Sequence, residues 1–206
     1  MSKYLGPLWK KSRALKTSLL ETGKEFSRGK KRMTSPGIHG DKRRRESTYG
    51  IQNKEKRKIC LRYGLREKNL YNLFIKAKKE KENTGNTLIK MCESRLDNLV
   101  FRSGLVNTRG FARLWVSQGH FLVNGKKVKS PSYQVEIGQN ISFRKKEKMT
   151  ENQFVKSNLE QNAKIPPYLT FDKKNLIINY LRYPSPEEYS KDIDTSLVVE
   201  WYNRRI

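Results

Sequence analysis

Cysteine and histidine are scarce in this sequence, with two residues of each, and no apolar run approaches the length of a membrane span. Cys60 and Cys92 lie far apart in helical patterns, which argues against a disulfide framework and against a four-cysteine zinc site. His39 and His120 do not make a convincing acid–base system. The N-terminal letters MSKYLGPLWKK contain no apolar core of a secretory signal. We therefore expect a soluble intracellular protein that needs no metal, no cofactor and no small-molecule substrate.

Acidic residues are also few, because 20 Asp and Glu stand against 45 Lys and Arg. The net charge is +25 and the pI is near 10.1. A positive field of this size attracts polyanions and raises both the rate and the non-specific affinity of their binding. The excess falls within residues 1–150, since residues 151–206 contain eight basic and eight acidic side chains. We expect the basic part to contact a nucleic acid and the tail to contact protein. An anionic membrane fits less well, because the charge is not confined to one amphipathic helix.

Residues 87–144 have the most regular pattern in the chain. Apolar residues recur three and four positions apart in the first part and predict one helical stripe: Leu88, Met91, Cys92, Leu96, Leu99 and Val100. Gly104 suits the end of that helix, because glycine tolerates the left-handed conformation. Thr108 is the expected N-cap of a second short helix that ends at Gly119.

The period then changes to that of β-strands. Asn124-Gly125 lies between the apolar residues Phe121 and Val128 and favours a tight type I′ hairpin. Ile141 and Phe143 alternate along a further strand. The stretch therefore predicts two short helices packed on a small antiparallel sheet.

The polar residues of the same stretch are predicted to share faces of the two helices. Arg95, Asn98 and Arg102 stand at i, i+3 and i+7, and Arg109 and Arg113 stand one turn apart. Guanidinium pairs beside a lysine-bearing hairpin favour a surface that grips a phosphate backbone. The alternative, that a small basic domain simply keeps its charges in solvent, stays open on the pattern alone.

The run RLDNLVFRSG, followed by TRGFARLWVSQGHFLVNGKKV, resembles the RNA-binding module first described in small-subunit ribosomal protein S-four. The resemblance implies a compact α/β unit whose two helices and hairpin bind structured RNA. The module also occurs in some pseudouridine synthases, tyrosyl-tRNA synthetases and translation-rescue factors, so it implies RNA but not the ribosome. Such enzymes need a separate catalytic domain, and the residues after the module are too few and lack a Gly-rich phosphate loop or a Ser/His/Asp set. We therefore predict that the chain is not an enzyme.

The chain before the module is basic throughout. Residues 1–48 have little hydrophobic period and predict an extended arm, in which Lys42–Arg45 is the densest basic cluster. A solvated tail or a localisation tag is the alternative for that cluster. Two helical segments follow, 49–65 and 66–82. The first is basic over much of its surface, which favours contact with phosphates over a salt-bridged solvent face, and the second has a buried stripe over residues 70–77.

The chain after the module contains little charge imbalance. Residues 145–164 are polar and predict a helix, and two strand-like runs follow, Tyr168–Phe171 and Leu176–Leu181. The closing segment has an apolar ridge that should dock on protein, with the 70–77 stripe as the expected partner. The ridge consists of Leu197, Val198, Trp201 and Tyr202.

The resemblance covers nearly the whole chain. MSKYLGP, PGIHG, YGIQNKEKRK, RYGL, NTG and SYQV occur in the order found in ribosomal protein S-four of the bacterial type. That family implies a primary rRNA-binding protein that binds the 5′ domain of small-subunit rRNA early in subunit assembly. It also implies contact with neighbouring small-subunit proteins, notably S-five, a place where mRNA enters the ribosome, and an influence on decoding accuracy. No cysteine precedes Cys60, so the resemblance is to the form without an N-terminal zinc site.

Together these patterns predict an α+β protein with a basic extended arm (1–48), a mostly helical domain (49–86) completed by the C-terminal segment (182–206), and an RNA-binding module with its following β segment (87–181, with its core at 95–144). The predicted RNA-binding residues are Lys42, Arg43, Arg44, Arg45, Tyr49, Gln52, Lys54, Lys56, Arg57, Lys58, Arg62, Arg66, Arg95, Asn98, Arg102, Thr108, Arg109, Arg113, His120, Asn124, Lys126, Lys127 and Tyr133. The predicted partners are small-subunit rRNA, neighbouring ribosomal proteins and mRNA, in the cytoplasmic ribosome. The alternative function is a stand-alone translation-rescue factor that uses the module on the large subunit.

Overall fold

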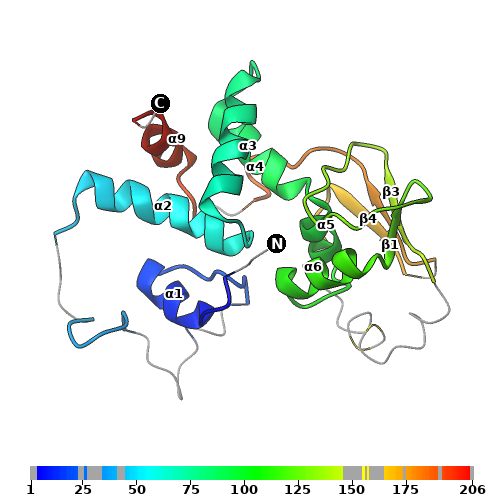
Figure 1. Cartoon of the computed structure of the whole chain (residues 1–206), viewed down its shortest axis with the longest axis horizontal. Coiled ribbons are helices and arrows are strands. Elements are labelled where there is room, and N and C mark those ends of the chain that lie inside the picture. Colours follow the sequence, from blue (N-terminus) through cyan, green and yellow to red (C-terminus); the bar gives the residue numbers. More distant parts are fainter. Residues whose placement is uncertain are drawn as a thin grey trace. The chain divides into compact units, whose positions relative to one another are not determined.

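The chain folds as two compact units, of which the first contains residues 1–88 and 190–206 and the second contains residues 89–189. The computed structural model describes residues 4–22, 26, 34–40, 45–145, 155, 157, 165–173, 175–189 and 192–204. Within these residues the first unit is helical, and the second combines helices with an antiparallel sheet (Figure 1). The predicted α+β class is therefore confirmed.

The first unit is built around the helix pair α2 and α9. The helix bounds are α1 Leu8–Leu15, α2 Thr48–Arg62, α3 Glu67–Lys79 and α9 Thr195–Asn203, and the unit also holds the start of α4, Thr84–Glu93. α2 and α3 agree with the two predicted helical segments. The C-terminal helix α9 packs on α2, and its Tyr202 ring stacks on Phe74 of α3 with 4.8 Å between the ring centroids. The C-terminal helix thus packs against helices from the first half of the sequence.

Helix α1 corrects the prediction that residues 1–48 form an extended arm. Ser12 of α1 is buried, and Leu19 just beyond it is 2% exposed. The Leu19 N–H donates to the Ser12 Oγ at 3.3 Å, and Lys16 ends the helix in the left-handed conformation, at φ 52°. The periodic pattern missed this helix because the residue that it buries is a small polar one. Several parts of the arm lie outside the described residues.

The second unit contains one five-stranded sheet with short helices packed on it. Besides the end of α4, its elements are α5 Leu96–Arg102, α6 Arg109–Gln118, β1 Phe121–Val123, β2 Lys126–Lys127, β3 Asn140–Phe143, β4 Leu169–Asp172 and β5 Ile177–Tyr180. All pairs are antiparallel, in the order β2-β1-β3-β5-β4. Asn124 and Gly125 have φ of 47° and 77°, which agrees with the predicted type I′ hairpin. The helix predicted over 145–164 lies almost wholly outside the described residues.

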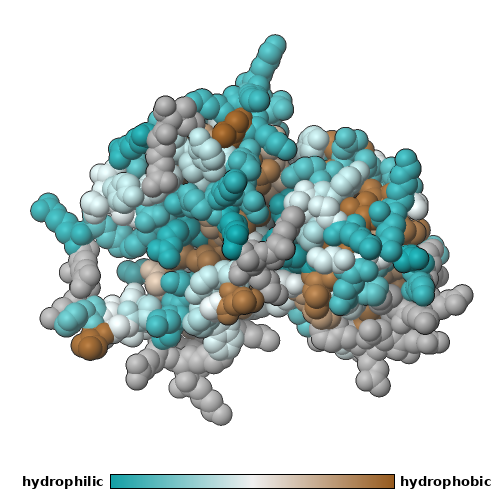
Figure 2. Space-filling model, in the orientation of Figure 1, coloured by the Kyte–Doolittle hydropathy of each residue, from teal (hydrophilic) through white to brown (hydrophobic). Residues whose placement is uncertain are grey.

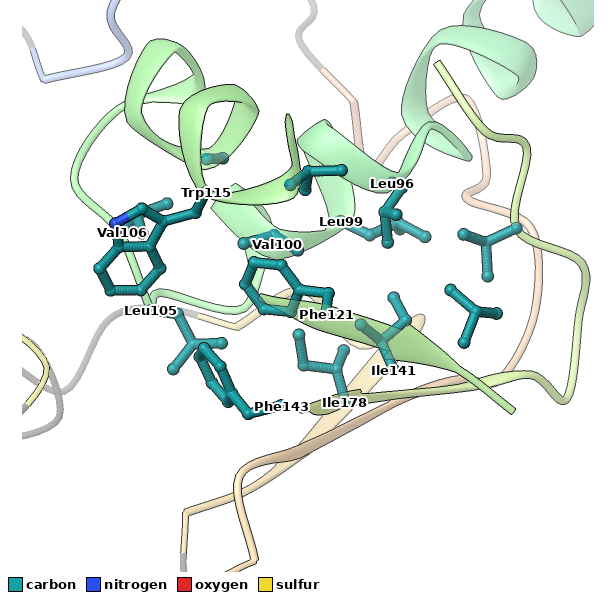
Figure 3. Packing of buried hydrophobic residues seen from close by; sticks show 14 of the residues in the cluster. Leu96, Leu99, Val100, Leu105, Val106, Trp115, Phe121, Ile141, Phe143 and Ile178 are labelled. Atoms are coloured by element: carbon teal, nitrogen blue, oxygen red, sulfur yellow. The ribbon is translucent and has the colours of Figure 1, made fainter. Parts of the chain in front are cut away.

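The core of the second unit lies between its helices and the sheet, where the labelled side chains of Figure 3 gather. Trp115 of α6 packs near Phe121 of β1 and Phe143 of β3, with ring centroids 6.5 and 6.2 Å away. Leu96 and Leu99 of α5 are fully buried in the same cluster. This core fixes how α5 and α6 are rotated, and therefore which of their polar side chains reach the surface.

The prediction of a single helix over residues 88–100 is wrong, because the chain breaks between α4 and α5. Arg95 stands before α5 with an extended backbone, at φ −69° and ψ 140°. The N–H groups of Leu96 and Asp97 donate to the carbonyls of Tyr133 and Pro131 rather than to the preceding turn. Both helices bury apolar residues on either side of the break. The apolar period therefore continues across the break, and the pattern does not reveal that the helix stops there.

The surface visible in Figure 2 is mostly hydrophilic, with the apolar colour confined to small separate areas. Along the described part of the chain, no helix combines the length and the apolar character required to cross a membrane. The same residues contain no group of three or more His, Cys, Asp or Glu side chains arranged to hold a metal ion.

Candidate nucleic-acid interface

Helix α6 positions two of the predicted arginines. The Thr108 side chain accepts a hydrogen bond from the Phe111 N–H at 3.2 Å, and Gly119 ends the helix at φ 78°, both as predicted. The side of α6 that faces the core is buried and consists of Ala112, Trp115 and Val116. Arg109 and Arg113 are consequently kept out of the core, and both are partly exposed.

Arg109 is held against α5 by two contacts. Its Nε donates to the Asn98 Oδ1 at 2.8 Å, and its guanidinium carbon lies 4.4 Å from the centroid of the Phe101 ring. A guanidinium bonded at Nε and stacked on a ring face has few orientations left. The interhelical contact therefore restricts the direction in which Arg109 presents its charge.

Arg95 is only 3% exposed, which corrects the prediction that it belongs to a presented row of arginines. Its Nε and Nη2 donate to the two carboxylate oxygens of Asp97, at 3.0 and 2.7 Å. The helix break places Arg95 at the start of α5, where the pair with Asp97 neutralises it. Arg113 lies in the field of this pair: burial lowers the pKa of Arg113, Asp97 acts to raise it and Arg95 acts to lower it. Arg95 and Arg113 are thus neighbours, although one is buried and the other partly exposed.

Asn98 is also buried, at 1% exposure, and it bonds to the carboxylate of Glu93, which is not among the predicted residues. Glu93, at the end of α4, has no exposed surface. It accepts hydrogen bonds from the Asn98 Nδ2 at 2.6 Å, from the Arg102 Nη2 at 2.9 Å and from the Tyr168 hydroxyl at 3.1 Å. Burial and the nearby charge of Glu93 raise the pKa of Tyr168, which keeps its hydroxyl proton on the oxygen. A buried carboxylate thereby links α4, α5 and the start of β4.

A second basic group, which we call the hairpin cluster, consists of Lys126, Lys127, Lys129 and Arg144. Arg144 lies beside Lys127 and is the main cause of the lowered pKa of that lysine, with burial and Lys129 as further causes. The stems of Lys127 and Lys129 cover Gly119: a Cβ added there would lie 2.7 Å from the Lys127 Cε and 3.3 Å from the Lys129 Cγ. Mutually repelling cations held at one edge favour a bound polyanion. Lys129 and Arg144 are not among the predicted residues, because the pairing of β1 with β2 and β3 that brings them to this edge cannot be read from a local pattern.

The remaining predicted residues of the second unit lie at its surface. The Asn124 side chain accepts from the Asn140 N–H at 2.9 Å, so it closes the hairpin against β3. His120 is partly exposed, with its Nε2 at 2.9 Å from the Gln118 Oε1. Tyr133 is 37% exposed. Of these, Tyr133 has the accessible aromatic surface on which an unstacked base could lie.

Three predicted residues of the first unit are buried, which corrects their assignment as surface contacts. Each bonds to an acidic side chain: Gln52 to Glu200 at 2.7 Å, Lys56 to Glu67 at 2.9 Å and Arg62 to Asp192 at 3.3 Å. Buried polar side chains require such partners, since desolvating an unpaired charge costs several kcal/mol. The basic face of α2 is therefore used in part to join α2 to α3 and to the C-terminal segment.

Other predicted RNA-binding residues of the first unit remain accessible. Exposed side chains are found at Arg45, Tyr49, Arg57 and Arg66, and partly exposed ones at Lys54 and Lys58. Lys54 bonds to Glu46 and lowers the pKa of that carboxyl group, whereas Lys58 bonds to Glu55 at 2.5 Å. Lys42, Arg43 and Arg44 lie outside the described residues.

The C-terminal ridge lies inside the first unit. Val198, Trp201 and Tyr202 are buried, and Leu197 is partly buried. Trp201 packs 4.5 Å from the Tyr49 ring and 4.5 Å below the Lys56 Nζ. The ridge therefore packs mainly inside the first unit.

Comparison with known proteins places both units in described families. Residues 3–93 match the family described as ribosomal protein S4/S9 N-terminal domain, and residues 94–141 match the S4 domain. Similar curated proteins are named small ribosomal subunit protein uS4. The one from Mesoplasma florum is 46% identical over 209 residues, with all of both chains covered. Those from Lactobacillus gasseri and Mesomycoplasma hyopneumoniae are 44% and 42% identical, and each alignment covers at least 99% of both chains.

Proposed function

This chain belongs to the uS4 family of small ribosomal subunit proteins, and on that premise we propose that it is a structural constituent of the small ribosomal subunit that binds the 5′ domain of small-subunit rRNA. In this role it nucleates subunit assembly and contacts neighbouring proteins, notably S-five. It lies near the channel through which mRNA reaches the ribosome and contributes to translational accuracy. It acts in the cytoplasm as part of the ribosome and has no enzymatic activity.

The observation that carries the RNA-binding proposal is the arrangement of arginines on α5 and α6. Arg102 and Arg109 come from different helices, yet both bond to the buried group formed by Glu93 and Asn98. The Arg109 guanidinium is bonded to Asn98 through its Nε, and ordering it before binding reduces the entropy lost when it associates with a phosphate. The hairpin cluster supplies further cations on the same unit.

The binding mechanism that this surface supports is electrostatic capture followed by recognition of RNA shape. Phosphate contacts dominate the affinity, so a protein that makes about 6–10 of them loses roughly 10³- to 10⁵-fold in binding between 50 and 200 mM salt. Unstacked bases can then stack on Tyr49 and Tyr133, which are 54% and 37% exposed. Tyr63, in contrast, is only 4% exposed and cannot stack on a base.

The alternative, a translation-rescue factor acting on the large subunit, is less well supported. The relatives named small ribosomal subunit protein uS4 align over the whole chain, including the first unit. A protein that used only the module would have no use for the exposed basic residues of the first unit, such as Arg45, Arg57 and Arg66.

The test is to crosslink the protein to RNA in cells, purify it and sequence the attached RNA. We expect small-subunit rRNA, enriched in its 5′ domain. Enrichment of large-subunit rRNA would overturn the proposal in favour of the rescue factor, and crosslinks spread without preference over both rRNAs would overturn both functions. The same purification from a strain that expresses the Arg109→Ala variant shows whether α6 lies at the contact, because the loss should be largest at one rRNA site.

A further inference from the structure

Glu93 is a charged side chain that lies beneath the proposed RNA surface rather than on it. It has no exposed area, yet it accepts four hydrogen bonds. Two come from the Nε and Nη2 of Arg102, at 3.2 and 2.9 Å, and one each from Asn98 and Tyr168, at 2.6 and 3.1 Å. An ionised carboxylate has about four acceptor positions, so these donors satisfy it.

Stability alone is a weak reason for such a group. Replacing a buried ion pair by apolar side chains of similar volume is often neutral or stabilising, because desolvation offsets much of the attraction between the charges. A buried polar network instead limits the arrangements that its members can adopt. The question is therefore which side chains Glu93 orients.

Glu93 determines how the Asn98 amide is turned. The Asn98 Nδ2 donates to the Glu93 Oε2 at 2.6 Å and to the Glu93 carbonyl at 3.0 Å. With the amide nitrogen used in this way, the Asn98 Oδ1 points to α6 and accepts from the Arg109 Nε at 2.8 Å. If the Asn98 amide rotated by half a turn, its NH₂ group would face the Arg109 Nε–H, and no hydrogen bond could form between these two donors. The carboxylate thus acts on Arg109 through Asn98, and on Arg102 directly.

We propose that Glu93 is a positioning residue for RNA binding, which holds the Arg109 guanidinium, through Asn98, in the orientation in which it meets a phosphate. Arg102, whose Nε and Nη2 are both bonded to Glu93, belongs to the support of this arrangement. This inference rests on the proposed function, because it requires that Arg109 contacts RNA. Glu93 itself touches no ligand. Its contribution to affinity comes from ordering Arg109 before the RNA arrives, so that less entropy is lost on binding.

The test uses the Glu93→Gln variant of the full chain, which keeps the volume and removes the charge. In the protein without RNA, NMR of the arginine side chains should show faster exchange of the Arg109 Nε proton with water. Affinity for a small-subunit rRNA fragment should fall about tenfold, a size typical of coupled neighbours. In the Arg109→Ala background, the same Glu93→Gln change should cost much less, because the arginine that it positions is already gone.

The matched control is Tyr180→Phe. The Tyr180 hydroxyl is buried in the same region, but it bonds to the Ser94 Oγ at 2.9 Å rather than to Glu93. This change should lower the melting temperature and leave both the RNA affinity and the Arg109 exchange rate unchanged. A similar loss of affinity in Tyr180→Phe would mean that any destabilisation of the unit weakens binding, and the proposal would fall.

Two other outcomes count against the inference. Equal losses from Glu93→Gln in both backgrounds, or an unchanged Arg109 exchange rate, would show that Glu93 does not act through Arg109. If Arg109→Ala alone binds as tightly as the unmodified chain, the RNA surface itself is misplaced, which is a failure of the proposed function. Should Glu93→Gln not fold, Asn98→Ala breaks the link to Arg109 while leaving Glu93 with Arg102 and Tyr168, and the same comparison applies.

Discussion

The cationic side chains of the second unit differ in what holds each one. Arg109 is bonded to Asn98, Arg95 is paired with Asp97 and buried, and Lys127 lies over a glycine beside Arg144. Only some of these side chains have their charge at the surface. The charge of a residue therefore does not say whether it binds RNA, and its burial and its partners have to be known.

The first residue-scale prediction concerns Arg109→Ala combined with Arg113→Ala. The double variant should keep its fold, because both side chains lie outside the core, and should bind junction RNA at least tenfold more weakly, since each charge-assisted hydrogen bond contributes about 1.5–3 kcal/mol. Filter binding at fixed salt measures the loss. Arg204→Ala, an exposed arginine after α9, is the control for removing a charge alone. Equal affinity of the double variant and the unmodified chain would contradict the placement of the RNA surface.

The second residue-scale prediction concerns acid stability. Hydrogen bonds from Arg182 are the main cause that lowers the pKa of Glu188 to about 2, with the Ser185 N–H as a further donor at 2.8 Å. Because the folded-state pKa is below the unfolded one, this carboxylate stabilises the fold above about pH 4.5, and the effect disappears as the pH falls through 2. Melting temperatures of the unmodified chain and Glu188→Gln should therefore differ at pH 6 and converge near pH 2. Glu187→Gln, at the neighbouring exposed position, is the control, and its melting temperature at pH 6 should equal that of the unmodified chain.

At the scale of elements, turns and caps follow from local chemistry, whereas helix breaks do not. Thr108, Gly119 and the Asn124-Gly125 hairpin each have the conformation that their residue type favours. The break before α5 has no such residue. It is made by carbonyls of the segment 131–133, which is distant in sequence and accepts the bonds that the helix would have made.

The element-scale prediction compares two glycines with the same backbone strain. Gly119 and Gly125 have φ of 78° and 77°, so an alanine at either position should cost about 1–2 kcal/mol. Only at Gly119 would the added Cβ meet a side chain, the Cε of Lys127 at 2.7 Å, because nothing lies within 4 Å of Gly125. Gly119→Ala should therefore weaken RNA binding beyond the effect of Gly125→Ala, although denaturation shows similar stability losses. Equal RNA affinities in the two variants would remove the hairpin cluster from the interface.

At the scale of the whole molecule, buried and accessible charged residues have different tasks. In the first unit, Gln52, Lys56 and Arg62 use acidic partners to join segments distant in sequence. In the second, the arginines of α5 and α6 and the hairpin cluster remain at least partly accessible. Substitutions at the buried residues should therefore change mainly stability, and substitutions at the accessible ones should change mainly RNA affinity.

Trp201→Ala tests this separation. Trp201 is 3% exposed and packs on Tyr49 and Lys56, so its removal should destabilise the first unit by about 3–5 kcal/mol. Cys60 reports on that unit, because burial raises the pKa of its thiol to about 12 and the folded protein should resist thiol reagents. Denaturant should expose Cys60 to labelling at a lower concentration in Trp201→Ala, whereas the affinity of the folded protein for RNA should fall much less than in the Arg109→Ala, Arg113→Ala variant. Trp9→Ala, at a site that is 36% exposed, is the matched control and should shift labelling much less. A stable Trp201→Ala variant that binds RNA poorly would mean that the tail itself contacts RNA.

The sequence by itself determined the α+β class, the α2, α3 and α6 helices, the hairpin and the family, because each depends on local patterns or on motifs in a recognisable order. Only the tertiary structure decided which charged residues are buried. Asn98 and Arg102 meet Glu93 across the break between two helices, and Arg62 meets Asp192 from the far end of the chain. Such pairings depend on segments that fold together, and the spacing of residues along one helix contains no information about them.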